Sequence, residues 1–144
     1  MSKSKKSTAL KDLRVYQLAH DVGKRISEIV IQWDNFNKHT LGRQFVRAAD
    51  SISLNICEGY GRFYYKENKM FCYYSRGSLI ETAECLIKAK ERNLISETNY
   101  LIIAEKLRRL KITLNKYIDS IGKQSINASG KENQENSGIR NPNH

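Results

Sequence analysis

The chain contains almost no proline, and the single one, Pro142, lies near the C-terminus. Because proline removes a backbone donor and clashes with the preceding helical turn, its scarcity permits long unbroken helices. No apolar run approaches the roughly 18 residues of a membrane span. The polar start MSKSKKST is not followed by the apolar stretch of a signal peptide. We therefore expect a cytoplasmic protein that does not associate with a membrane.

Residues that carry metal or redox chemistry are also few. The three cysteines, Cys57, Cys72 and Cys85, form no CxxC pair and fall within apolar helical patterns, which predicts buried, reduced thiols. The three histidines fall on a helix face, in a loop and in a tail, and form no pair suited to metal binding or nucleophile activation. We expect no catalytic residue, no metal, no cofactor and no enzymatic activity.

Acidic residues are scarce relative to basic ones. The sequence has 25 Lys and Arg against 15 Asp and Glu, which gives a net charge of +10. Excess positive charge favours polyanionic partners, because phosphates bound by cations release their counterions. Charge therefore points to nucleic acid, RNA or DNA, as the partner.

The chain has the length of one domain and polar ends. Its 144 residues suit a single core. Residues 1–9 and 124–144 are rich in Ser, Asn, Lys and Gly and almost free of apolar residues. We predict that they form a disordered basic N-terminal tail and a disordered polar C-terminal tail, flanking a domain at 10–123.

Apolar residues within this domain recur at steps of three and four, the spacing of one helix face. The stripes run over 15–29, 41–59, 65–92 and 100–121, and the last is a continuous heptad series typical of coiled-coil packing. The segment 32–42 contains Asn, Asp and Gly and is predicted to be a loop. The pattern predicts an all-α fold, an antiparallel up-down four-helix bundle.

The second and fourth predicted helices also carry apolar residues away from their seams, which suggests an oligomer. These residues are Val46, Ala49, Ile56, Leu101, Ile102, Ile112 and Ile118.

The stretch SLNICEGYGR (53–62) places polar residues and glycines on a predicted helix. It lacks the third glycine of GxGxxG and the lysine of a Walker loop, and no histidine follows a glutamate at the ExxH spacing of a di-metal bundle. We interpret it as structural: Asn55 and Glu58 are half-buried, and Gly59 and Gly61 end the helix in a left-handed conformation. The expected hydrogen-bond donors are Ser75, Ser78, Arg47 and Arg76. A ligand-binding role for this cluster stays open.

Two motifs carry a resemblance to a known family. RAADSISLNICEGYGR (47–62) and GSLIETAECL (77–86) resemble the RAAxSIPxNIAEGxGR and GSLxELExxL signatures of the 23S rRNA-intervening sequence protein family, and a weaker likeness covers about 10–122. Ser53 replaces the usual proline, which predicts a straighter second helix, and Tyr64 replaces a capping Ser or Thr. The residues that match the core of the motifs are Asn55, Glu58, Gly59, Gly61, Gly77, Ser78 and Glu81.

The resemblance implies a homo-oligomeric ring of four-helix bundles, typically a pentamer, without known catalysis. It also implies a distant relation to the accessory proteins of diversity-generating retroelements, which bind nucleic acid through basic surfaces and contact a reverse transcriptase.

We therefore expect a non-enzymatic oligomer that binds the backbone of RNA or DNA with little sequence specificity. The candidate contacts are Arg43, Arg47, Arg62, Lys66, Arg109, Lys116 and Lys123. The aromatic residues at 60 and 63–65 either stack on bases or pack within the protein. The alternative function is a protein-interaction scaffold for a polymerase or a ribosome-associated partner.

Overall fold

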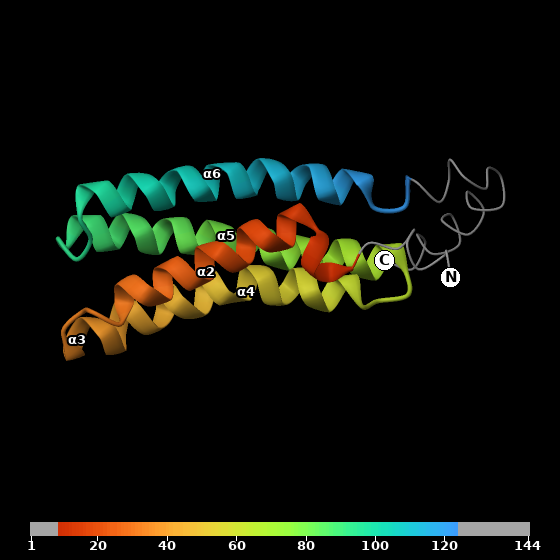
Figure 1. Cartoon of the computed structure of the whole chain (residues 1–144). Coiled ribbons are helices and arrows are strands. Elements are labelled where there is room, and N and C mark those ends of the chain that lie inside the picture. The colour runs from red at the N-terminus through yellow and green to blue at the C-terminus, as the bar shows by residue number, and fades with distance from the viewer. Residues whose placement is uncertain (1–8, 124–144) are drawn as a thin grey trace.

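The computed structural model describes residues 9–123 and contains four long helices in that range (Figure 1). They are α2 (Arg14–Val30), α4 (Arg43–Tyr60), α5 (Tyr65–Glu91) and α6 (Glu97–Ser120). The shorter elements are the 3-10 turn η1 (Leu10–Asp12), α3 (Asn35–Asn37) and the π-helical turn η2 (Lys38–Gly42). Residues 9–123 contain no strand, so the all-α prediction is confirmed. Apart from Ala9, the predicted tails lie outside the described residues.

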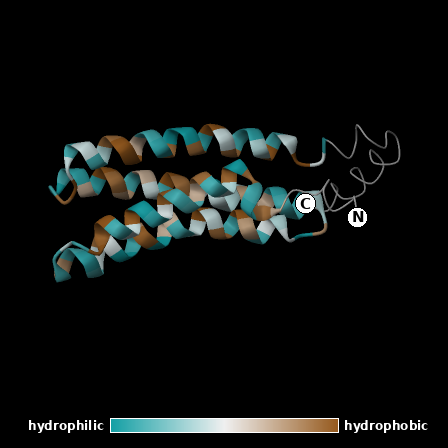
Figure 2. Cartoon of the chain, in the orientation of Figure 1, coloured by the Kyte–Doolittle hydropathy of each residue, from teal (hydrophilic) through white to brown (hydrophobic). Residues whose placement is uncertain are grey.

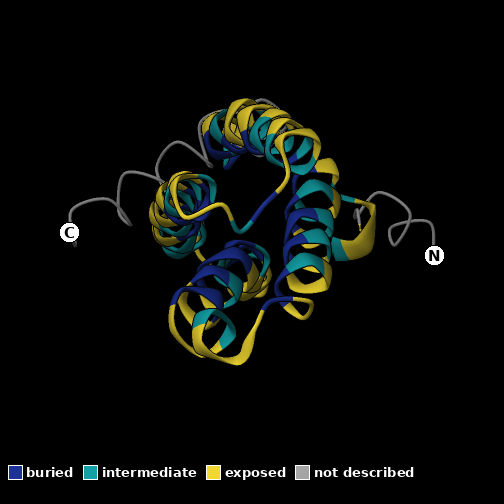
Figure 3. Cartoon of the chain, turned by 90° about the vertical axis from the view of Figure 1, so that its left-hand side faces the viewer, coloured by how far each residue is buried: buried dark blue, intermediate teal, exposed yellow. Residues whose placement is uncertain are grey.

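The four long helices surround one core. α4 packs against α2 and α5, and α6 packs against the same two helices, so α4 and α6 lie diagonally across the molecule. The view along the helices shows their buried faces turned toward a common centre (Figure 3). Hydrophobic residues recur along each helix (Figure 2), and Phe45, Ile52, Ile103 and Leu110 are fully inaccessible to solvent. Burial of these side chains provides the main driving force for folding.

The heptad seam predicted for the fourth helix is largely confirmed. Leu107, Leu110 and Leu114 are buried along α6, while Tyr117 lies at the margin of the core and Ile118 takes the more buried position. The helix begins at Glu97 because the side chain of Ser96 accepts a hydrogen bond from the Asn99 amide at 3.0 Å.

The predicted loop 32–42 is wrong over most of its length. The Asp34 side chain accepts a hydrogen bond from the Asn37 amide at 3.2 Å and starts a helical segment that continues through η2 into α4. Gly42 is buried here. It packs closely against α2, because a Cβ at that position would lie 2.7 Å from Val30 Cγ1. The Asp and Gly that suggested a loop therefore serve as a helix cap and a close packing contact.

The end of α4 also differs from the prediction. The helix stops at Tyr60, but Gly61 has φ of −81° and does not take the left-handed conformation. Gly59 lies inside the helix and is buried. α5 starts at Tyr65 as expected, although its N-cap, Tyr64, provides no side-chain cap.

Three of the residues assigned to an oligomer surface belong to the core instead. Ala49, Ile56 and Ile118 are buried, whereas Leu101 and Ile112 are exposed as predicted. The other two, at 46 and 102, are half-buried.

The prediction of three buried thiols holds for two of the cysteines. Cys72 and Cys85 are buried, but Cys57 is exposed. Burial raises the pKa of the Cys72 thiol to about 11. Cys57 therefore has the more accessible thiol.

Candidate nucleic-acid interface

The seven predicted contact residues are distributed over α4, the start of α5, and α6 with the residues that follow it. Arg43 and Arg47 lie one turn apart on α4, whereas Arg109 and Lys116 lie on α6. All four side chains are exposed. Because α4 and α6 do not neighbour each other, these cations form separate surfaces and not one patch.

The remaining three cations come together at one end of the molecule. Arg62 follows the last turn of α4, and Lys66 lies in the first turn of α5. Gly122, at φ of +90°, packs its backbone against the ring of Tyr65, where a Cβ on the glycine would lie 3.2 Å from Tyr65 Cδ2. This contact holds Lys123 beside the start of α5, at the end where α4 connects to α5 (Figure 1). We call Arg62, Lys66 and Lys123 the basic end.

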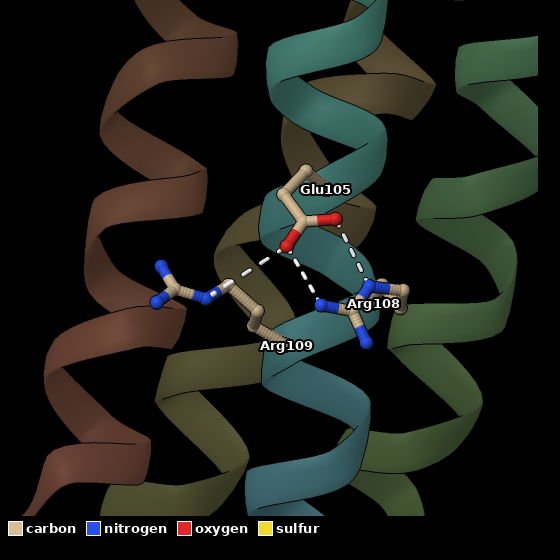
Figure 4. Close-up of polar contacts among 3 residues, drawn as sticks. All are labelled: Glu105, Arg108 and Arg109. Atoms are coloured by element: carbon tan, nitrogen blue, oxygen red, sulfur yellow. Dashed lines mark hydrogen bonds and ion pairs between the residues drawn. The ribbon is translucent and has the colours of Figure 1, made fainter.

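Two of the seven cations are paired with carboxylates. The Nη2 atom of Arg62 lies 2.6 Å from Glu58 Oε2. Glu105 receives two hydrogen bonds from Arg108, at 2.9 and 2.7 Å, and lies 3.9 Å from Arg109 Nε (Figure 4). The hydrogen bond from Arg108 lowers the pKa of the Glu105 carboxyl. Sequence reasoning missed Arg108, although its i,i+3 spacing from Glu105 was a usable signal.

The other five cations have no such partner. Within residues 9–123, no carboxylate lies within 4 Å of the side-chain nitrogens of Arg43, Arg47, Lys66, Lys116 or Lys123. A phosphate that approaches them does not have to displace an internal anion. These five cations can therefore contact phosphate at little cost.

The polar cluster of SLNICEGYGR is held together differently from the prediction. Asn55 Nδ2 donates to the Ser51 carbonyl in its own helix at 2.9 Å. Glu58 is exposed and pairs with Arg62 at the i,i+4 spacing, so its predicted burial was wrong. A carboxylate four residues from an arginine is satisfied at the helix surface and needs no donor from a neighbouring helix.

Two predicted donors do connect helices, but to other acceptors. Ser75 Oγ is buried and donates to the Ile52 carbonyl of α4 at 2.8 Å. Arg76 Nη1 donates to Asn115 Oδ1 of α6 at 2.6 Å. Ser78 instead acts as an acceptor: its backbone carbonyl accepts a hydrogen bond from the Thr82 hydroxyl at 2.7 Å. Polar contacts thus tie α5 to both of its neighbours, and the contact with α6 also includes the ion pair between Lys90 and Glu97 at 2.6 Å.

The two motif glycines inside helices have opposite surroundings. A Cβ on Gly59 would lie 2.7 Å from Asn68 Oδ1, 2.9 Å from Phe71 Cβ and 3.0 Å from the Asn68 carbonyl oxygen. A Cβ on Gly77 would meet nothing within 4 Å. Gly59 is required by the close approach of α4 and α5, whereas no contact in the described protein requires Gly77.

A shallow groove between α2 and α4 is the clearest alternative site. Its volume is about 300 Å³, and its lining includes His20, Asp50 and the exposed Cys57. Burial raises the pKa of Asp50, and nearby His20 opposes that shift. Among residues 9–123, no three His, Cys, Asp or Glu side chains come close enough together to hold a metal ion.

A family model describing the 23S rRNA-intervening sequence protein matches residues 11–116. The chain belongs to this family. The match includes both motif blocks and six of the seven candidate cations, while Lys123 lies just beyond it. No curated protein matches the chain significantly. In this member of the 23S rRNA-intervening sequence protein family, none of the helices in residues 9–123 has the length and apolarity needed to cross a bilayer.

Proposed function

We propose that the protein is a non-enzymatic, cytoplasmic nucleic-acid-binding protein that contacts the RNA or DNA backbone with little sequence specificity. The observation that supports this most directly is the set of five cations without a carboxylate partner in the described chain. Each bound phosphate releases a counterion, so affinity must fall steeply as salt rises. Backbone contacts of this kind position a protein without reading bases.

We further propose that the four helices form an antiparallel up-down bundle that assembles into a homo-oligomeric ring, a pentamer by family resemblance. Helices consecutive in sequence pack side by side, as an up-down bundle requires. Tyr73, Ile80 and Ile87 are exposed and spaced by seven along α5, so they share one face of the helix, which we call the outer α5 stripe. Such an apolar stripe supports contact with a second copy.

Binding to fluorescent structured RNA and to duplex DNA across a salt series tests the proposed function. The double variant Arg43→Glu/Arg47→Glu removes two unpaired cations one turn apart. Lys24→Glu/Lys90→Glu is its matched control, because it changes the net charge equally at two lysines already paired with Glu28 and Glu97. We expect the first variant to weaken binding much more than the control. Equal losses, or no binding by the wild type at low salt, would refute the proposal.

The solution mass of the same samples tests assembly. Ile80→Glu places a charge in the outer α5 stripe and should reduce the mass of an oligomer toward that of the monomer. Thr98→Glu, at an exposed position of α6, controls for the added charge. An unchanged mass for Ile80→Glu would exclude this stripe from the assembly contact.

The second candidate function is a protein-interaction scaffold for a reverse transcriptase or a ribosomal component. It is favoured by exposed apolar residues at the α3 end of the molecule, where Phe36 is 71% exposed and Ile31 is 59% exposed. An apolar protein interface responds weakly to salt, whereas phosphate contacts respond strongly. A salt-insensitive complex would therefore favour the scaffold.

A further inference from the structure

Aromatic side chains gather at the corner where α4 connects to α5. Phe63 is 81% exposed and its ring lies edge-on to that of Tyr64, with centroids 4.9 Å apart. Phe71 and Tyr74 form a second edge-on pair, with centroids 5.5 Å apart. The Arg62 guanidinium lies over the Phe71 ring at 4.8 Å, and Arg62 directly precedes Phe63 in the chain. We call these four aromatic residues the aromatic corner.

The backbone fixes the position of this corner. Without a side chain at Gly59, α5 approaches α4 so closely that the Phe71 Cβ lies 2.9 Å from where a Gly59 Cβ would stand. Lys66, Met70 and Tyr74 follow at four-residue spacing on α5, so a cation and a partly exposed methionine share the face of Tyr74. The corner therefore combines a preorganised set of rings with adjacent positive charge.

The core does not account for these rings. Tyr74 is 51% exposed, and neither it nor Phe63 belongs to the buried cluster at the centre of the molecule. Single exposed aromatic residues are ordinary, but two edge-on pairs near one corner, one of them in contact with an arginine, form a patch. Rings flanked by cations are the combination that binds single-stranded nucleic acid, because bases stack on the rings while phosphates contact the cations.

The corner and the proposed assembly surface adjoin at Tyr73 and Tyr74 but extend toward different neighbouring helices. The guanidinium of Arg76 lies 5.1 Å from the centroid of the Tyr73 ring. Arg76 also donates a hydrogen bond to Asn115 of α6. The outer α5 stripe thus borders α6, whereas Phe71 and Arg62 border α4.

We propose that the aromatic corner binds an unpaired strand of nucleic acid by stacking bases on Phe63 and Tyr74, with Lys66 contacting its phosphates. This inference rests on the proposed function and adds a preference for unpaired strands. In a duplex the faces of the bases are covered by their neighbours, so a stacking surface discriminates against it. RNA and DNA single strands share the required chemistry.

The test compares a labelled unstructured 12-nucleotide strand with the same strand annealed to its complement, by fluorescence anisotropy, in RNA and DNA versions. Phe63→Ala and Tyr74→Ala should each raise the Kd for the single strand at least about fivefold and leave the Kd for the duplex nearly unchanged. Phe63→Trp should retain single-strand affinity. Phe36→Ala, an equally conservative change of an exposed ring at the opposite end of the molecule (Figure 1), should affect neither. The strand with the lower Kd, RNA or DNA, identifies whether the site prefers ribose or deoxyribose.

The outcomes separate this inference from the function beneath it. If both strands bind but Phe63→Ala/Tyr74→Ala changes neither affinity, or changes both equally, the stacking site is refuted and backbone binding stands. If neither the strand nor the duplex binds the wild type at low salt, the proposed function itself fails. Thermal unfolding of each variant confirms that the fold is retained, which the exposure of both residues leads us to expect.

Discussion

The two faces of α5 differ in a way that the protein's own core does not explain. Leu79, Thr82 and Leu86 are buried on the inner face, as expected for a helix in a bundle. On the outer face, however, Ile80 is 64% exposed and its stripe is apolar where a soluble helix usually carries charge. The inner face is explained by folding alone. The outer face would be explained by the proposed assembly contact.

The two motif glycines that lie inside helices, Gly59 and Gly77, show the same contrast. Gly59 is needed because atoms of α5 occupy the space that its side chain would take. Gly77 has open space around it, although a glycine in a helix costs about 1 kcal/mol relative to alanine. Nothing in residues 9–123 offsets this cost, whereas the proposed assembly would offset it if the backbone of a second copy lay close to Gly77.

Truncation of neighbouring residues on the inner and outer faces of α5 should show the difference between these faces most clearly. Leu79→Ala removes buried methyl groups and leaves a cavity, so it should lower the free energy of unfolding by about 2–5 kcal/mol. Ile80→Ala, one residue along the chain, should change it by less than about 0.5 kcal/mol. Urea denaturation at a concentration where the protein is monomeric measures both. Similar losses for the two would place Ile80 in the core.

Alanine at the two glycines should give effects of opposite sign. At Gly59 the collision with Asn68 and Phe71 costs about 1–3 kcal/mol and outweighs the roughly 1 kcal/mol of added helix propensity. At Gly77 only the gain applies, so Gly77→Ala should stabilise the monomer by up to about 1 kcal/mol. Denaturant unfolding of the monomer measures both changes. A destabilising Gly77→Ala would show that the position is constrained within one chain.

The helices and their seams could be predicted because a period of three and four directly reports a buried face. The width of the buried face on each helix could not be predicted in this way. Each helix contacts two neighbours, so its buried arc extends beyond a single heptad seam, and Ala49, Ile56 and Ile118 were misassigned to the surface for this reason. The segment 32–42 was misread because the same residue types form loops and cap helices.

The chemical identity of the candidate site was predictable, but its grouping was not. Seven cations and nearby aromatic residues could be named from the chain. Their separation onto diagonal helices follows from the packing order. The placement of Lys123 at the same end of the molecule as Lys66 depends on the contact between Gly122 and Tyr65, a long-range contact with no local signal. The pairing of Glu58 with Arg62, in contrast, could have been recognised from its spacing.

Removal of the hydroxyl that crosses from α5 to α4 should have a modest effect on stability. Ser75→Ala deletes the buried hydrogen bond to the Ile52 carbonyl and should cost about 1 kcal/mol. Ser53→Ala is the control, because the Ser53 hydroxyl donates only within its own helix, to the Asp50 carbonyl at 3.3 Å, near the surface. Denaturant unfolding should separate the two variants. Equal losses would assign the effect to helix propensity and not to the contact between helices.

The smallest effect is expected where α2 and α6 meet at the margin between buried and exposed faces. Lys106 Nζ lies 2.6 Å from Asp21 Oδ2, and this hydrogen bond lowers the pKa of the Asp21 carboxyl below its ordinary value. Because the folded pKa is depressed, the stabilisation is present above pH about 4 and is lost as pH falls through the folded value. Partial exposure limits it to less than about 1 kcal/mol.

Asp21→Asn should therefore lower the free energy of unfolding slightly at pH 7, and the difference from wild type should shrink as the carboxyl protonates in acid. Urea denaturation of both proteins at neutral and acidic pH measures this difference. Asp119→Asn, which removes an exposed carboxylate without an ion-pair partner in residues 9–123, should show no comparable loss at pH 7. A difference that persists unchanged in acid would mean that Asp21 stabilises the fold by packing, since protonation removes the charge that attracts Lys106.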